Sequence, residues 1–117
     1  MAARLEFEKV GDGRFAIRGD LGFETVTDAL EKSKALFDDY PRIEIDLSGV
    51  TEGDSAGLAL LLEWVNWAKY YVREIRYIAI PEQIRAIAEI SEVEDMLRIG
   101  ERWTGPIEKR EEDADDQ

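Results

Sequence analysis

The sequence contains no cysteine and no histidine among its 117 residues. Without these residue types the chain cannot build thiol nucleophiles, Ser-His-Asp triads, disulfides or zinc sites with His or Cys ligands. Long hydrophobic runs are missing too, because the longest uninterrupted apolar stretch, residues 58–62, is far shorter than the ~20 residues that span a bilayer. Most common catalytic machinery and direct membrane insertion are therefore not expected.

Basic residues are scarce, with 15 Lys and Arg against 27 Asp and Glu and a formal charge of −12. This charge disfavours binding to nucleic-acid phosphates or to anionic lipid head groups. The first residues lack the apolar core of a signal peptide, so we expect a cytoplasmic protein. With 44% hydrophobic residues, the chain suits one globular domain, which we place at residues 1–105.

The end of the sequence is its most acidic part. Residues 108–117 contain six acids and two bases and almost no apolar side chains. A segment of this composition cannot bury enough apolar surface to fold. We therefore predict that residues 106–117 form a disordered acidic tail.

The N-terminal pattern predicts a β-hairpin. Leu5 and Phe7 alternate with glutamates, a Gly-Asp-Gly turn covers residues 11–13, and Phe15 and Ile17 alternate with arginines. The acids of one strand would face the bases of the other. This face of the sheet is therefore expected to be open to water.

The following pattern alternates helices and strands. A first helix is predicted from apolar and small residues at helical spacing, which are Phe23, Val26, Leu30, Ser33 and Phe37. A strand is expected at 43–47, a polar loop at 48–54, a helix from about 55 to 72 and a strand at 75–80. Pro81 suits the first turn of a third helix, and a short helical turn is predicted around residues 93–97. This order predicts an α/β fold with a right-handed βαβ crossover.

The second predicted helix begins with a hydroxyl group. Ser55 follows Asp54 directly after a strand, where unpaired backbone N–H groups of the helix converge. Both residues are favoured N-caps, so capping is one interpretation. The other is a contact or regulatory hydroxyl, because α/β sheets place sites at the carboxyl ends of strands and the helix dipole would stabilise a phosphate there.

The apolar arc of this helix covers roughly 180°, wider than the ~100° that suffices for docking on one sheet. It consists of Leu60, Leu61, Trp64, Val65, Trp67, Ala68, Tyr71 and Val72. In one interpretation the helix is wedged between the sheet and neighbouring helices, and the tryptophans complete the core. In the other, Trp64, Trp67 and Tyr70 lie at the edge of the arc as anchors of a protein interface.

Three acids raise the question of catalysis or magnesium binding, namely Asp46, Glu52 and Asp54. Asp46 is expected on the open face of a strand, and no basic residue lies nearby to hold a phosphorylated substrate. The glycines at 49, 53 and 57 are not followed by the Lys-Ser/Thr ending of a phosphate loop. We therefore predict no catalytic residues, no metal site and no cofactor, and a phosphate-handling enzyme is the least favoured function.

The segment Asp54-Ser55-Ala56-Gly57-Leu58, after a strand that ends in Ser48-Gly49, resembles the STAS domain family of sulfate transporters and anti-sigma factor antagonists. The resemblance covers about residues 5–100 and implies the SpoIIAA-like fold, a small mixed β-sheet with helices packed mainly on one face. The apolar run up to Trp64 and residues 81–90 are most similar to the MlaB-like STAS subunit of the Mla-type phospholipid transport ABC complex.

This resemblance implies a non-enzymatic, protein-binding function. In the MlaB-like group, a Ser or Thr at the position of Ser55 contacts the ABC transporter ATPase subunit in a system that maintains outer-membrane lipid asymmetry. The chain would then regulate this ATPase and lie peripheral to the inner membrane. The alternative is an anti-sigma factor antagonist, in which an anti-sigma factor kinase phosphorylates Ser55.

The partner-contact surface implied by the resemblance is the loop at 48–54 together with the first turns of the second helix. Its predicted residues are Asp54, Ser55, Ala56, Gly57, Leu58 and Leu62. Ser55 would supply a hydrogen bond, and the small Ala56 and Gly57 would permit close approach of the partner's backbone. Leu58 and Leu62 would bury apolar surface against the partner.

Overall fold

The computed structural model describes residues 4–100. Its elements follow in the order β1 (Leu5–Gly11), β2 (Arg14–Leu21), α1 (Val26–Phe37), β3 (Arg42–Gly53), α2 (Ser55–Tyr70), β4 (Glu74–Ile78), α3 (Glu82–Ile90) and α4 (Glu94–Gly100). The strands form one sheet in the order β1-β2-β3-β4. The β1/β2 pair is antiparallel, as the predicted hairpin requires, and the β2/β3 and β3/β4 pairs are parallel.

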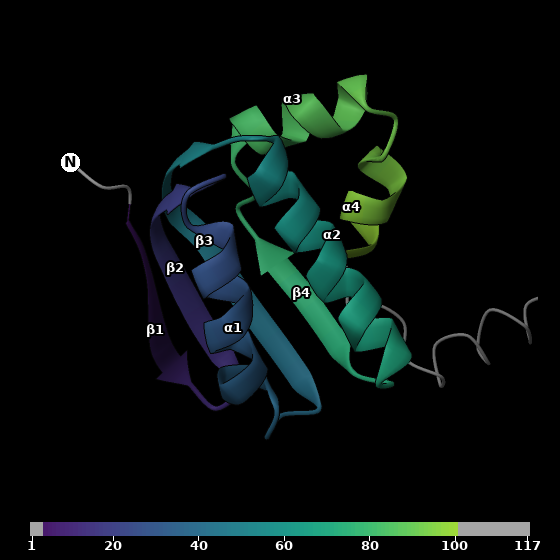
Figure 1. The fold of residues 1–117 in the computed structure, drawn as a ribbon. Coiled ribbons are helices and arrows are strands. Elements are labelled where there is room, and N and C mark those ends of the chain that lie inside the picture. The colour runs from purple at the N-terminus through teal and green to yellow at the C-terminus, as the bar shows by residue number, and fades with distance from the viewer. Residues whose placement is uncertain (1–3, 101–117) are drawn as a thin grey trace, which may run out of the picture.

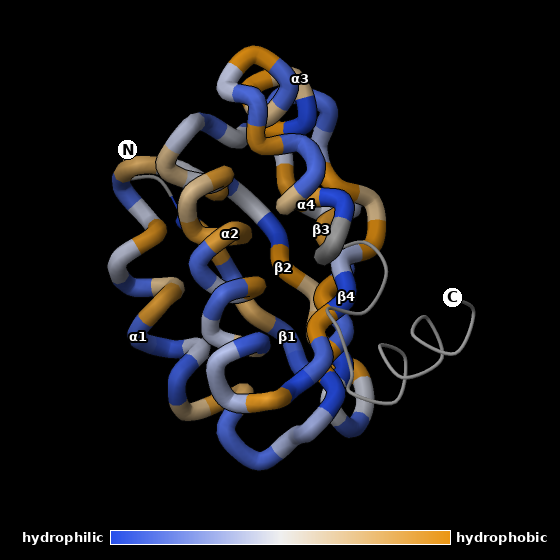
Figure 2. Tube along the Cα trace, turned by 90° about the vertical axis from the view of Figure 1, so that its right-hand side faces the viewer, coloured by the Kyte–Doolittle hydropathy of each residue, from blue (hydrophilic) through white to orange (hydrophobic). Residues whose placement is uncertain are grey.

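The helices lie mainly on one face of this mixed sheet. Figure 1 shows α1 and α2 in front of the strands, α3 beyond one end of the sheet, and α4 beside α2. In the side view of Figure 2, α1 and α2 again lie on the same side of the strands. The predicted arrangement, a small mixed sheet with helices mainly on one face, is therefore confirmed.

The core lies between the sheet and the α1/α2 layer. The inner face of the strands contributes Phe15, Ile17, Ile43, Ile45, Leu47, Ile75 and Tyr77, all of them buried. Helix α2 contributes Leu61, Trp64, Val65 and Ala68 to the same core. Strand alternation and helical spacing therefore indicated most of the buried residues correctly.

The opposite face of the sheet carries rows of opposite charges. Arg18 Nη1 lies 2.6 Å from Glu8 Oε1 across the β1/β2 hairpin. Glu44 on β3 pairs with Arg14 of β2 at 3.5 Å and with Arg76 of β4 at 3.7 Å. The predicted pairing of acids and bases on the polar face of the hairpin is confirmed.

Two predicted boundaries were wrong. Phe23 precedes α1, which begins at Val26, and its side chain is 83% exposed. Residues 48–53 continue β3, because their backbone still pairs with β2 through Asp20↔Glu52 and Leu21↔Gly53 after two shifts of register. Ladder hydrogen bonds with a neighbouring strand therefore outweighed the loop-like composition of this stretch.

The residues of the aromatic arc differ in burial. Trp64 is 1% exposed, its Nε1 donates a hydrogen bond to Ser33 Oγ at 3.0 Å, and its ring packs edge-on against Phe37. Trp64 is therefore a core residue. Trp67 is half-buried and Tyr70 is 80% exposed near the end of α2.

The C-terminal half agrees with the predicted element order. Strand β4 is slightly shorter than expected, Pro81 is the N-cap directly before α3, and the predicted short helical turn is α4. No helix within residues 4–100 has the length and apolar character needed to cross a membrane. The predicted disordered tail at 106–117 lies outside the described residues.

Candidate functional site

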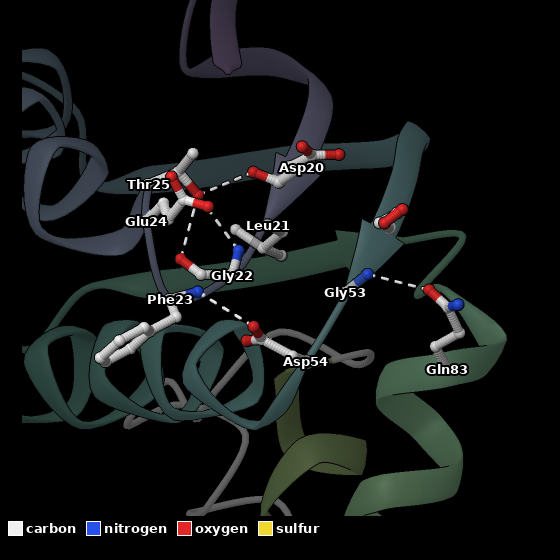
Figure 3. A pocket seen from close by; sticks show the side chains of 10 residues that line it. Asp20, Leu21, Gly22, Phe23, Glu24, Thr25, Gly53, Asp54 and Gln83 are labelled. Atoms are coloured by element: carbon white, nitrogen blue, oxygen red, sulfur yellow. Dashed lines mark hydrogen bonds between the residues drawn. The ribbon is translucent and has the colours of Figure 1, made fainter. Parts of the chain in front are cut away.

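The candidate site lies where β3 ends and α2 begins. A hollow of about 250 Å³ opens there beside the β2–α1 connection and the start of α3. Figure 3 shows the labelled side chains that surround it. Its lining residues are Asp20, Leu21, Gly22, Phe23, Glu24, Thr25, Glu52, Gly53, Asp54 and Gln83.

Asp54 organises this site as the N-cap of α2. Its Oδ1 accepts hydrogen bonds from Ala56 N at 2.9 Å and from Gly57 N at 3.1 Å, which satisfies two helix N–H groups. Its Oδ2 accepts a third bond from Phe23 N at 3.0 Å, drawn in Figure 3. One carboxylate thereby fixes the start of α2 and also the β2–α1 connection.

Opposing effects act on the charge of Asp54. Partial desolvation raises the pKa of its carboxyl, but hydrogen bonds from the backbone N–H groups of Phe23, Gly57 and Ala56 together outweigh it and leave the pKa below its ordinary value. The folded site therefore favours the ionised carboxylate. This matches the positive end of the α2 dipole, where a negative charge is stabilised.

Ser55 is exposed in the first turn of α2. Because Asp54 performs the capping, the interpretation of Ser55 as the cap was wrong. Within residues 4–100, no hydrogen bond joins the Ser55 hydroxyl to another side chain or to the backbone. The hydroxyl faces solvent and is accessible to a partner or to a modifying enzyme.

The other predicted contact residues differ in accessibility. Ala56 and Leu62 are partly exposed on α2. Gly57 is buried, and a Cβ at this position would clash with the carbonyl oxygen of Leu21, so the glycine allows α2 to pack on the end of β2. Leu58 is 4% exposed and belongs to the core, which corrects its prediction as a residue that buries against a partner.

The sequence patterns missed three residues that shape the site. Phe23 was placed on a helix, yet it is exposed beside Asp54. Thr25 donates a hydrogen bond from its hydroxyl to Asp20 O at 2.7 Å and thereby holds the β2–α1 connection. Gln83 of α3 accepts a bond from Gly53 N at 2.9 Å and fixes α3 to the end of β3. The Phe23–Asp54 and Gly53–Gln83 bonds join residues 31 and 30 positions apart, which no local pattern reveals.

Of the three acids considered for catalysis, Asp46 lies apart, whereas Glu52 and Asp54 both line the hollow beside the start of α2. Asp46 lies in the middle of β3, where its Oδ1 accepts a bond from Ser48 N. Glu52 is six residues further along the same strand, roughly 20 Å away in extended chain. In residues 4–100, no group of three or more carboxylates is arranged to hold a metal ion. That these acids form no catalytic or magnesium site stays a prediction.

A family model described as "Mlab, STAS domain" matches residues 7–98, which is most of the chain. The chain belongs to the STAS domain family. The match includes every strand and helix that surrounds Ser55.

A solved structure supports the same fold for this STAS domain. The unphosphorylated form of the anti-sigma factor antagonist SpoIIAA matches it with a TM-score of 0.57 and 19% sequence identity. The match covers 81% of this chain and 98% of SpoIIAA. No curated protein sequence matches the chain. The SpoIIAA-like fold predicted from the sequence is therefore confirmed.

Proposed function

We propose that this STAS domain is a non-enzymatic subunit that binds and regulates the ATPase subunit of a phospholipid-transport ABC complex. The observation that carries the proposal is the match of residues 7–98 to the family model named for MlaB. STAS domains act chiefly by binding other proteins, and within residues 4–100 no group of three or more carboxylates is arranged to hold a metal ion. Binding would stabilise the ATPase in its assembled state, which requires no chemistry in this chain.

The proposed contact surface is the first turn of α2 with the adjoining β2–α1 connection. Ser55 offers an exposed hydroxyl for a hydrogen bond, and Ala56 leaves room for the partner beside it. Phe23 adds a large apolar side chain that is already exposed, and aromatic residues carry much of the binding energy of interfaces. Asp54 contributes by fixing both segments to each other.

The second candidate is an anti-sigma factor antagonist that is switched by phosphorylation of Ser55. The exposed, unbonded hydroxyl of Ser55 favours this alternative, because a kinase requires such access. The carboxylates of Asp20, Glu24, Glu52 and Asp54 line the adjacent hollow without a basic residue among them. A phosphate there would meet repulsion from these acids as well as attraction from the helix dipole.

The test replaces Ser55 by Glu in the tagged full-length chain expressed in its own cells. Negative charge is tolerated at a helix start, so Ser55→Glu is expected to fold, with a melting temperature close to that of the wild type. We expect the ABC ATPase subunit to co-purify with the wild type and to be lost with Ser55→Glu, because the variant places an unpaired charge in a buried interface. Ser91→Glu, the same change at another exposed serine, is the control and should retain the ATPase.

The same purification separates the two candidates. Abundant phosphate on Ser55 by mass spectrometry, with a kinase as the captured partner, would replace the transporter proposal by the antagonist alternative. Retention of every partner by Ser55→Glu would show that this surface binds neither. Ser55→Ala should change stability by less than about 0.5 kcal/mol, because Asp54 and not Ser55 caps the helix.

A further inference from the structure

A groove runs along the seam between α1 and α2. Two hollows of about 270 and about 180 Å³ lie between these helices, and both are lined by Leu30 and Glu63, so they are consecutive parts of one depression. The first hollow is lined by Val26, Thr27, Leu30, Ala56, Ala59, Leu60 and Glu63. The second hollow extends to Trp67. The groove formed by both hollows therefore runs along about three turns of α2.

The groove is mainly apolar, and its second hollow is also lined by Ser33 and by Lys34, whose ammonium pairs with Glu31 of α1. Val26, Leu30 and Trp67 are half-buried, so each presents part of an apolar side chain to a bound segment. Ala56 and Ala59 project little from α2, which leaves the hollow open and permits the close approach of another backbone. Thr27 and Glu63 are the polar residues that line the first hollow.

Glu63 places a single negative charge at the middle of this mainly apolar groove. Its side chain is exposed, and no ion pair joins it to another residue in the described range 4–100. Two acids of α1, in contrast, already have ion-pair partners: Asp28 pairs with Lys32 at 3.0 Å and Glu31 pairs with Lys34 at 3.2 Å. A basic group on a bound segment would therefore find Glu63 available.

We propose that this groove receives an amphipathic helix whose apolar face packs on α1 and α2 and whose Lys or Arg pairs with Glu63. The inference rests on the proposed function in one respect, since it assigns the helix to the ATPase subunit that binds at Ser55. Ala56 both follows Ser55 and lines the groove, so the two surfaces are continuous. The stretch from Ala56 to Trp67 extends roughly 16 Å, which a helix of about three turns would cover.

The experiment measures the affinity of the purified full-length chain for the purified ATPase subunit recovered with it. Glu63→Lys is expected to weaken binding about tenfold or more, because it places like charges in contact. Ala59→Trp fills the groove and should have a similar effect. Glu89→Lys on α3 and Ala35→Trp on α1 make the same changes at exposed positions that do not line the groove, and should bind like the wild type.

A photo-crosslinking residue at position 59 supplies the second measurement. The crosslink should map to a helical segment of the ATPase subunit that contains a Lys or Arg, and reversing that charge to Glu should restore binding to Glu63→Lys. A crosslink to a non-helical or acidic segment would overturn the proposed occupant. The proposed occupant would also be overturned if Glu63→Lys and Ala59→Trp bound the ATPase subunit with unchanged affinity while Ser55→Glu still abolished binding. That result would leave the proposed function intact. If the wild-type chain binds no ATPase subunit, the proposed function fails and this inference fails with it.

Discussion

One carboxylate holds together the surface that we propose for partner binding. The two oxygens of Asp54 accept bonds from the first turn of α2 and from the backbone of Phe23, which is 31 positions earlier in the sequence. Gly22 is also adapted to this contact, because a Cβ there would lie 2.6 Å from Asp54 Oδ2. Asp54 therefore acts on the partner surface by positioning its neighbours.

Replacing Asp54 by Ala should destabilise the domain by about 0.5–2 kcal/mol, because it removes the helix cap. Asp54→Asn keeps one side-chain oxygen for Ala56 and Gly57 but cannot also accept the bond from Phe23, so a smaller loss is expected. Urea unfolding at neutral pH measures both. An Ala variant as stable as the wild type would show that solvent satisfies the first turn of α2 equally well.

The lowered pKa of Asp54 predicts that the stability of the domain depends on pH. Because the folded structure lowers the pKa of Asp54, the ionised carboxylate contributes stability above the ordinary pKa of an aspartate, and this contribution is lost as the pH falls through the folded value. The stability difference between the wild type and Asp54→Asn should therefore stay constant from neutral pH down to about pH 5 and shrink as the pH falls below about 5. Asp39→Asn, at an exposed acid after α1, is the control for the loss of one carboxylate.

The sequence patterns predicted the type and order of the helices and strands better than their lengths. Alternation in β3 correctly placed Ile43, Ile45 and Leu47 in the core, because one face of the strand is buried. The same strand continues to Gly53 through pairing with β2, which depends on residues distant in sequence. The Asp54-Ser55 start of α2 was likewise visible in the sequence, whereas its bonds to Phe23 and the contact of α3 through Gln83 arise only from the tertiary arrangement.

The packing of α2 on β2 gives a prediction opposite to that of helix propensity. Gly→Ala inside a helix ordinarily stabilises by about 1 kcal/mol. At Gly57, a methyl group would clash with Leu21 O and lie 3.1 Å from Leu21 Cγ, so Gly57→Ala should instead destabilise by about 1–3 kcal/mol. Thermal and urea unfolding test this, with Ala59→Gly at an exposed position of α2 as the measure of propensity alone. A more stable Gly57→Ala would show that α2 can move away from β2 at little cost.

At the scale of the whole molecule, negative charge and apolar surface lie together around the start of α2. Carboxylates line the hollow beside Ser55, while Phe23 is exposed and the α1/α2 groove is mainly apolar. With a formal charge of −12, the chain would attract a basic partner surface over a distance and repel acidic ones. Apolar contacts would then hold the partner once it has docked.

The C-terminal residues allow this long-range effect to be separated from folding. Deleting residues 108–117 removes six acids and two bases, which takes the formal charge from −12 to −8. Because the segment has almost no apolar side chains, we expect its loss to change stability by no more than about 0.5 kcal/mol. Association with the ATPase subunit should become slower at low salt and less sensitive to added salt, because steering by net charge is screened over about 10 Å at 0.1 M.

Stopped-flow association rates at increasing salt, together with melting curves, measure both parts of this prediction. A variant that keeps residues 108–117 but replaces their six acids by Gln or Asn is the matched control, since it removes more negative charge without shortening the chain. This control should reduce the salt dependence at least as much as the deletion does. If only the deletion slowed association, chain length and not charge would be responsible, and a large loss of stability on deletion would show that the segment packs on the domain.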